Sequence, residues 1–299
     1  MHNTTQATTT SKLHLVNTAF IALSHCFAVV AILYMSLVEF NWWSLGLGIV
    51  YFAFCGLSIT GGYHRLFAHP TYQARAFLRM FYLFFGSASV QNSALKWSAD
   101  HRTHHGKVDQ TEDPYNIKRG FWWAHLGWVL YKAPADGDMH NVMDLKKDPL
   151  VMLQHRHYLL FAVFSTAVLP FSLGLIWGDP IGALLIAGFL RLVVQWHATF
   201  AVNSVAHKLG TRLYTTKVSA RDSILTTLIT FGEGYHNYHH RFQGDYRNGI
   251  RWFHFDPTKW FVWTCSKLHI TWDLKRASKE AIARARAAVL AETALSANG

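Results

Sequence analysis

Residues 236–240 read His-Asn-Tyr-His-His, and residues 101–105 read His-Arg-Thr-His-His. A third string, residues 64–69, reads His-Arg-Leu-Phe-Ala-His, and the three strings together hold eight of the chain's 19 histidines. Offsets of three and four residues fall on one face of an α-helix. Each of the two five-residue strings is therefore expected to present its three imidazoles in one direction.

The string at residues 64–69 needs a different geometry. His64 and His69 are five residues apart, which is about 140° around a continuous α-helix. We expect them to converge only if the helix ends between them. Pro70 favours a helix end near His69, because proline disfavours helix at the residue before it.

A ninth candidate ligand, His207, follows Asn203 by one helical turn. Neutral imidazole suits zinc, copper, iron or nickel. One tetrahedral zinc takes at most four ligands, so nine imidazoles fit two metals with four or five nitrogens each. For redox chemistry on an apolar substrate we favour iron, and the sequence alone leaves zinc open. The predicted metal-binding residues are His64, His69, His101, His104, His105, His207, His236, His239 and His240, with Asn203 nearby.

The histidine strings flank membrane-length apolar segments. Hydrophobic residues make up 51% of the chain and charged residues only 15%, against about 25% in an average globular protein. About 20 apolar residues span a bilayer as a helix. We predict an all-α integral membrane protein in two hairpins, with spans at residues 15–35, 43–62, 158–177 and 181–202.

Basic residues predict the orientation of these spans. The turns at 36–42 and 178–180 contain no Lys or Arg, whereas residues 63–156 contain 12 and residues 203–299 contain 14. The positive-inside rule therefore predicts cytoplasmic termini and a cytoplasmic helical cap, residues 63–157 and 203–299, within a single domain, residues 1–299. The net charge of +11 is attributed to basic residues on the cytoplasmic side of the membrane, so no nucleic-acid partner is expected. The stretch 1–11 lacks a basic region, so no cleavable signal peptide is predicted.

Two groups of polar residues have expected structural roles. Arg191 lies inside the fourth apolar segment, where we expect structural pairing or snorkelling. Metal-bound imidazoles usually donate their second N–H to a carboxylate or a carbonyl oxygen. The acidic residues near the strings are candidates for this contact, although a surface role is equally compatible with each: Asp100, Glu112, Asp113, Glu233 and Asp245.

The order of the three strings between two pairs of spans resembles that of the membrane fatty-acid desaturases. The closer similarity is to the Δ9 acyl-CoA (stearoyl-CoA) desaturases, and it covers roughly residues 15–285. It rests on five local strings, namely Gly-Gly-Tyr-His-Arg-Leu at 61–66, Asp-His-Arg-Thr-His-His at 100–105, Asp-Pro-Tyr-Asn at 113–116, Asn-Ser-Val-Ala-His at 203–207 and Gly-Glu-Gly-Tyr-His-Asn-Tyr-His-His at 232–240.

The resemblance implies a non-haem di-iron enzyme (Fe2+/Fe3+) that uses O2 and two electrons to introduce a cis double bond. By the family pattern, one iron takes His64, His69, His101, His105 and His240. The other takes His104, His207, His236 and His239, with Asn203 acting through water. The implied partners are a fatty acyl-CoA or acyl-lipid substrate, a lipid membrane, and a ferredoxin-like or b-type cytochrome donor. The implied location is a bacterial inner membrane, or the endoplasmic reticulum in a eukaryote.

The resemblance also implies a buried acyl tunnel. Trp97, Thr199 and Phe200 match its bend, where Phe200 replaces the expected tryptophan, and Phe52 matches its closed end. Positions that contact the acyl carrier are matched by Gln91, Asn92 and Asp100. Ordinary packing is the alternative role for the tunnel residues.

Two departures bear on the carrier. Ala99 and Tyr131 stand where the acyl-CoA branch has basic residues for phosphates. Either nearby cations replace these contacts, with Lys118, Arg119 and Lys132 as candidates, or the acyl group is esterified to a membrane lipid. Two other functions are considered, a sister di-iron lipid hydroxylase or ketolase, and a non-enzymatic metal-binding membrane protein.

Overall fold

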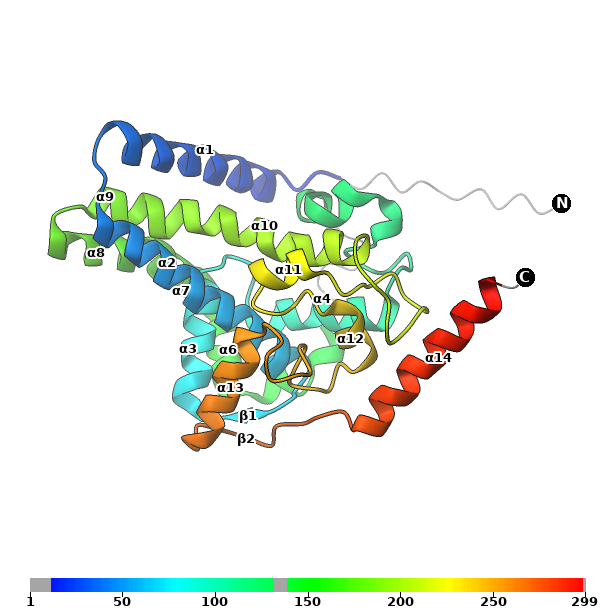
Figure 1. Ribbon diagram of the computed structural model, residues 1–299. Helices are drawn as coiled ribbons and strands as arrows, with labels where there is room; N and C mark the ends of the chain where they lie inside the picture. The colour runs from blue at the N-terminus through cyan, green and yellow to red at the C-terminus, as the bar shows by residue number, and fades with distance from the viewer. Residues whose placement is uncertain (1–11, 132–138, 298–299) are drawn as a thin grey trace.

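The computed structural model describes residues 12–131 and 139–297. The predicted N-terminal stretch 1–11 and Lys132 lie outside the described residues. Four helical segments are long and apolar enough to cross a membrane, and they pack side by side (Figure 1). They are Leu15–Leu37, Trp42–Ala68, Tyr158–Trp177 and Pro180–His207. The prediction of an all-α protein with four transmembrane helices is confirmed, and two short strands are the only β-sheet in the described part.

Three of the four spans change winding along their length. The first span is the regular helix α1 (Leu15–Leu37), and the second joins α2 (Trp42–Leu57) to the π-helix η1 (Ser58–Ala68). The third consists of α7 (Tyr158–Val163), η6 (Phe164–Val168), α8 (Leu169–Gly174) and η7 (Leu175–Trp177). The fourth consists of α9 (Pro180–Ala183), η8 (Leu184–Leu190), α10 (Arg191–Ser204) and η9 (Val205–His207).

The second span continues six residues beyond the predicted end at residue 62. Gly61 and Gly62 do not break the helix, because they serve close packing. A Cβ atom on Gly62 would lie 2.5 Å from Cβ of Tyr82, on the neighbouring helix α3 (Ala76–Ser87). The absence of side chains thus lets η1 and α3 approach closely while the span winds on through the first histidine string.

A buried aspartate joins the spans at the end where the two hairpins turn. Asp179 accepts hydrogen bonds from Tyr34 of α1 at 2.9 Å and from Ser44 of α2 at 2.6 Å. It also caps α9 by accepting from the backbone N–H of Gly182 at 2.8 Å. Gly178, with φ of 80°, makes the left-handed turn that precedes it. One side chain therefore ties three of the four spans together.

Shorter helices form a cap at the opposite end of the spans (Figure 1). Strand β1 (Gln73–Ala74) pairs antiparallel with β2 (Thr271–Trp272) and joins distant parts of the cap. A hydrophobic core runs between η1, α3 and the cap helices around Tyr63, Tyr82 and Leu95. The remaining cap helices are α4 (Ala94–Lys107), η2 (Ile117–Arg119), η3 (Trp123–Gly127), α5 (Trp128–Leu130), η4 (His140–Val142), η5 (Leu145–Lys147), α6 (Pro149–Arg156), α11 (Ile224–Ile229), α12 (His236–Arg241), α13 (Pro257–Lys267) and α14 (Lys279–Ala297).

Arg191 has the structural role that we predicted. Its buried guanidinium donates to the carbonyl oxygens of Ala187 and Ala88, each at 2.9 Å, and to Gln195 at 3.3 Å. Gln195 in turn donates to Ser89. These bonds fix the turn between α3 and α4, which carries two of the predicted substrate residues.

Candidate metal centre

The π-helical winding of η1 brings the first two candidate ligands together. The backbone N–H of His69 donates to the carbonyl oxygen of His64 at 3.0 Å, which is the i→i+5 bond of a π-helix. Residues five apart then lie nearly one turn apart, and the two imidazole centroids are separated by 5.0 Å. The predicted helix end near His69 is confirmed, because η1 ends at Ala68 and His69 is its C-cap residue. The prediction assumed α-helical winding before that end, and the π-helical bond is the feature that it did not include.

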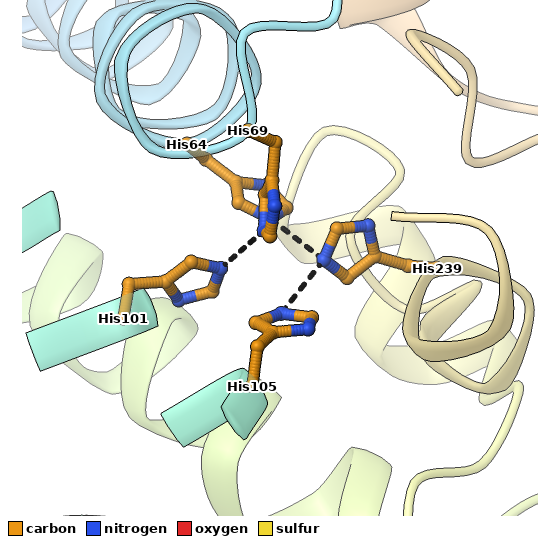
Figure 2. A group of neighbouring side chains, drawn as sticks. All are labelled: His64, His69, His101, His105 and His239. Atoms are coloured by element: carbon orange, nitrogen blue, oxygen red, sulfur yellow. Dashed lines mark hydrogen bonds between the residues drawn. The ribbon is translucent and has the colours of Figure 1, made fainter. Parts of the chain in front are cut away.

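All nine predicted histidines converge in two adjacent groups. Figure 2 shows the first group, in which the rings from η1, α4 and α12 turn toward a common centre. Within each group, one nitrogen per histidine lies within 4.8 Å of all the others. The first group consists of His64, His69, His101, His105 and His239, and the second of His104, His207, His236 and His240.

The expected division of the last string was wrong, because His239 and His240 exchange places. His239 belongs to the first group and His240 to the second. On a helix, residues four apart are separated by only about 40° around the axis, so His236 and His240 point in nearly the same direction. His239, three residues after His236, points to the other side of these two side chains. The string on α4 follows the same rule, since His101 and His105 share a group and His104 joins the other.

The spacing of the nitrogens fits metal ions. In the first group, Nε2 of His239 lies 2.9 Å from Nε2 of His64 and 3.0 Å from that of His105. Hydrogen bonds alone do not account for this, because an Nε2 atom donates or accepts in one in-plane direction. Two donors bound at right angles to an ion, each at about 2.1 Å, are separated by about 3.0 Å. An all-imidazole donor set at this spacing suits a transition metal.

The second group has similar spacing. Nε2 of His236 lies 2.9 Å from Nε2 of His207 and 3.1 Å from that of His240. His104 lies 3.3 Å from His240 by the same measure. Both groups therefore present their Nε2 atoms inward.

Two carboxylates orient histidines by accepting hydrogen bonds from Nδ1, the ring nitrogen that faces away from the metal centre. Glu233 accepts from Nδ1 of His64 at 2.7 Å, and Asp113 accepts from Nδ1 of His104 at 2.8 Å. A proton held on Nδ1 leaves Nε2 free for a metal. Two of the five predicted carboxylates thus contact candidate ligands. Of the others, Asp245 pairs with Arg247, Asp100 with Lys96, and Glu112 lies 4.0 Å from Lys107.

Several supporting residues were missed by sequence reasoning. Arg65, which is 1% exposed, donates to Glu233 at 2.8 Å and to Asp256 at 2.9 Å. On the other side of the site, Ser219 lies 2.7 Å from Nδ1 of His207 and is itself bonded to Asp109. Arg65 had one signal in the sequence, as a charge inside a buried helical string. Ser219 and Asp109 lie 110 residues apart, and nothing in the sequence indicates their contact.

The protonation states also suit metal binding. Burial lowers the pKa of His69, His101, His105, His236, His239 and His240 well below the usual 6.5, and neighbouring histidines lower it further. These side chains are neutral at pH 7, as ligands must be. Burial alone raises the pKa of Glu233, but the adjacent His64 and Arg65 outweigh it and lower the pKa to about 2. The carboxylate is therefore ionised.

Several predicted substrate residues lie beside the first group. The indole of Trp97 stacks on His101 with centroids 4.8 Å apart, and its N–H donates to Gln91 at 3.3 Å. Gln91 then donates to Thr199 of α10 at 3.1 Å. These three residues form one chain from the histidines to the fourth span.

The other predicted substrate and site residues occupy separate positions. Phe200 is buried next to Thr199 and packs against Trp128, whereas Phe52 packs against Phe231. Asn92 is exposed, with its backbone N–H bonded to the hydroxyl of Tyr158. Asn203 is half-buried on α10, one turn before His207.

Comparison with known proteins gives a consistent result. Residues 40–273 match the family of fatty acid desaturases. A probable acyl-CoA desaturase of Schizosaccharomyces pombe is 46% identical over 76% of this chain and 48% of its own length. Acyl-CoA desaturase 1 of Saccharomyces cerevisiae is 43% identical over 79% of this chain and 47% of its own. Human stearoyl-CoA desaturase is 37% identical over 89% of this chain and 75% of its own length. The chain spans about half the length of the two yeast relatives.

Proposed function

The chain belongs to the fatty acid desaturase family, and from this premise we propose that it introduces a cis double bond, of the Δ9 type, into a saturated acyl chain. The observation that carries the proposal is the convergence of nine imidazoles in two groups at one end of four spans. In each turnover the acyl chain gives up two hydrogens, the donor supplies two electrons and the solvent two protons. One O2 is reduced to two waters.

The two histidine groups are proposed to hold two iron ions. The first group supplies five nitrogens, and the second supplies four, with Asn203 completing it through water. When bound, the ions supply the activation of O2 that hydrogen removal from an unactivated methylene requires. Glu233 and Asp113 keep His64 and His104 in the tautomer that binds metal.

The chain Trp97–Gln91–Thr199 is proposed to position the acyl chain. It places an aromatic ring against His101 and anchors that ring to the fourth span. A methylene chain offers no polar group to recognise, so its reacting bond is placed by the shape of the site. Phe200, Phe52, Asn92 and Asp100 remain proposed contacts of the tunnel and of the carrier.

We propose acyl-CoA as the carrier, because the relatives at 43–46% identity are named acyl-CoA desaturases. Ala99 and Tyr131 lack the charge expected for phosphate contacts. Arg119, whose guanidinium lies 3.2 Å from the ring centre of Trp123, and the neighbouring Lys118 are proposed to replace them. An acyl-lipid substrate is the competing possibility.

The multi-pass chain is proposed to lie in a bacterial inner membrane, or in the endoplasmic reticulum of a eukaryote. Its cap and termini then face the cytoplasm, where a ferredoxin-like or b-type cytochrome donor is available. Modification of single introduced cysteines in the cap and in the turn 36–42, using a membrane-impermeant thiol reagent, tests this orientation. Labelling of the cap in intact cells contradicts it.

The activity is tested by expression in a host that lacks its own desaturase. We expect a new cis double bond at the Δ9 position in the fatty-acid profile. A hydroxylated or ketolated lipid without a new double bond would favour the sister chemistry and refute desaturation. Supplying purified protein with labelled acyl-CoA or labelled phospholipid, together with a reductant, then distinguishes the two carriers.

A further inference from the structure

A pocket of about 500 Å³ lies between α14, the start of α12 and the chain segments 209–214 and 248–254. Its lining, within the described residues, includes none of the nine histidines of the metal centre. Arg286 enters it from α14, and Arg251 and His254 enter from the loop before α13. The acidic lining residue, Asp222, is engaged by the backbone N–H groups of Asn237 and Tyr238 at the start of α12. The cationic groups therefore dominate the pocket.

Three polar atoms in this lining are buried and lack a hydrogen-bond partner among the described residues. They are Nε of Arg286, Nδ1 of His254 and Oδ1 of Asn248. Asn248 is 2% exposed and uses its amide N–H to hold Glu233 at 2.8 Å, so its oxygen is fixed as an acceptor. Buried polar atoms without partners are costly, so these three atoms are available to hydrogen-bond a bound ligand. Such a ligand offers anionic oxygens to the arginine and a hydroxyl to the asparagine.

The loop that carries Arg251 and His254 is rigidly built. The ammonium of Lys259, on α13, donates to the carbonyl oxygens of Gly249, Arg251 and His254 at 2.8–3.1 Å. The ring of His254 stacks on Tyr235 with centroids 5.2 Å apart. The pocket therefore has its shape before a ligand arrives, which reduces the entropic cost of binding.

The pocket opens beside the lipid-facing surface. Ile224, which lines it, begins α11, and this helix lies next to α10 (Figure 1). Ile224 is 79% exposed, and Leu225 and Leu228 are exposed with it. Trp252, next to Arg251, is 84% exposed. Exposed aliphatic residues beside the spans and an exposed tryptophan next to an arginine are typical of the headgroup level of a membrane.

We propose that this pocket binds the phosphate-bearing headgroup of an anionic phospholipid. Arg251 and Arg286 pair with the phosphate oxygens, and Asn248 accepts from a headgroup hydroxyl. Ile224, Leu209 and Leu213 line the side on which the acyl chains leave. A free phosphate shares the charged part of this chemistry but leaves the apolar lining uncovered. None of the nine histidines lines the pocket, so the proposal does not rest on the proposed activity, although Asn248 also contacts Glu233 behind His64.

The test uses the full chain, delipidated in detergent and titrated with phosphatidylglycerol or phosphatidylcholine, with retained lipids counted by native mass spectrometry. We expect the double variant Arg251→Gln/Arg286→Gln to need at least about tenfold more phosphatidylglycerol for half-occupancy of one site, because it removes both charges that pair with the phosphate. The variant Lys279→Gln/Arg284→Gln removes the same charge from α14 outside the pocket, and it should bind like the wild type.

The variant Arg251→Lys/Arg286→Lys keeps the charge and should retain most of the binding. Its thermal unfolding temperature should equal that of the wild type, which excludes a folding defect. Equal loss of binding in the control and pocket variants would show diffuse attraction and overturn the proposal. Inorganic phosphate that displaces the lipid at equal concentration would assign the pocket to a free anion instead. Equal retention of phosphatidylcholine would likewise refute an anionic headgroup site.

Discussion

Replacing Glu233 with glutamine is expected to lower iron affinity without removing any ligand. One carboxylate oxygen accepts from His64 at 2.7 Å and from Asn248 at 2.8 Å, while the other accepts from Arg65 at 2.8 Å. Glutamine has one accepting oxygen, and the charged guanidinium competes for it more strongly. The amide N–H then faces Nδ1 of His64, which must give up its proton. The proton moves to Nε2, so this histidine no longer binds metal.

The size of the effect follows from what is lost. Disturbing such a supporting contact typically costs 10- to 100-fold in metal affinity, or about 1.4–2.8 kcal/mol. Breaking a buried ion pair outright costs about 3–5 kcal/mol of stability. Because Arg65 keeps Asp256, we expect a smaller loss of stability than that. Chelator competition with iron quantified by mass spectrometry measures the affinity, and thermal unfolding measures the stability.

The matched control is Glu112→Gln. It removes the same charge from an exposed side chain that lies 4.0 Å from Lys107, and it should leave iron binding unchanged. Iron affinity of Glu233→Gln equal to that of the wild type, with both proteins folded, would refute the argument that the carboxylate sets the tautomer of His64.

Three further predictions follow from the structure. His207→Ala should lower bound iron and abolish desaturation while the chain stays folded, and full activity would remove His207 from the site. Asp179→Ala should lower the free energy of unfolding by about 3–5 kcal/mol, since two buried donors and the half-buried hydroxyl of Tyr34 lose their acceptor, whereas the exposed Asp273→Asn should change it little in the same denaturation series. Six site histidines have lowered pKa values, so below about pH 6.5 the unfolded metal-free chain binds more protons than the folded chain. The free energy of unfolding should then decrease as the pH is lowered, by at most about 1.4 kcal/mol per pH unit for each histidine, and should stay level above pH 7. A thermal unfolding temperature that rises on acidification would contradict this.

The spans and the set of converging histidines were predictable from the sequence, because both depend on local composition and spacing. Apolar length alone indicates a membrane helix. The offsets in residues 101–105 and 236–240 place their histidines on helix faces, and the structure confirms that the faces meet. His207 needed one additional step, since it is a single histidine at the end of a span.

The division of ligands between the groups could not be predicted from the sequence. It depends on how α4 and α12 are rotated about their axes, and tertiary packing decides that rotation. The π-helical winding of η1, which packs against Tyr82 at Gly62, was likewise not predicted from the sequence. The choice of Glu233 over Asp245 as a contact of His64 depends on where Arg65 is buried, and no local pattern encodes that position.

The alternation of histidines on α4 and α12 has a consequence for how metal enters the protein. Each of these helices supplies donors to both groups, so an ion in one group immobilises the backbone that carries donors of the other. Binding of the first ion therefore includes most of the entropic cost of ordering these helices, and the second ion binds to a site that is already ordered. Loading should be positively cooperative, with the one-ion species scarce at every iron concentration in native mass spectra. We therefore expect the protein to bind two ions as one unit and to change between a metal-free and a fully loaded state.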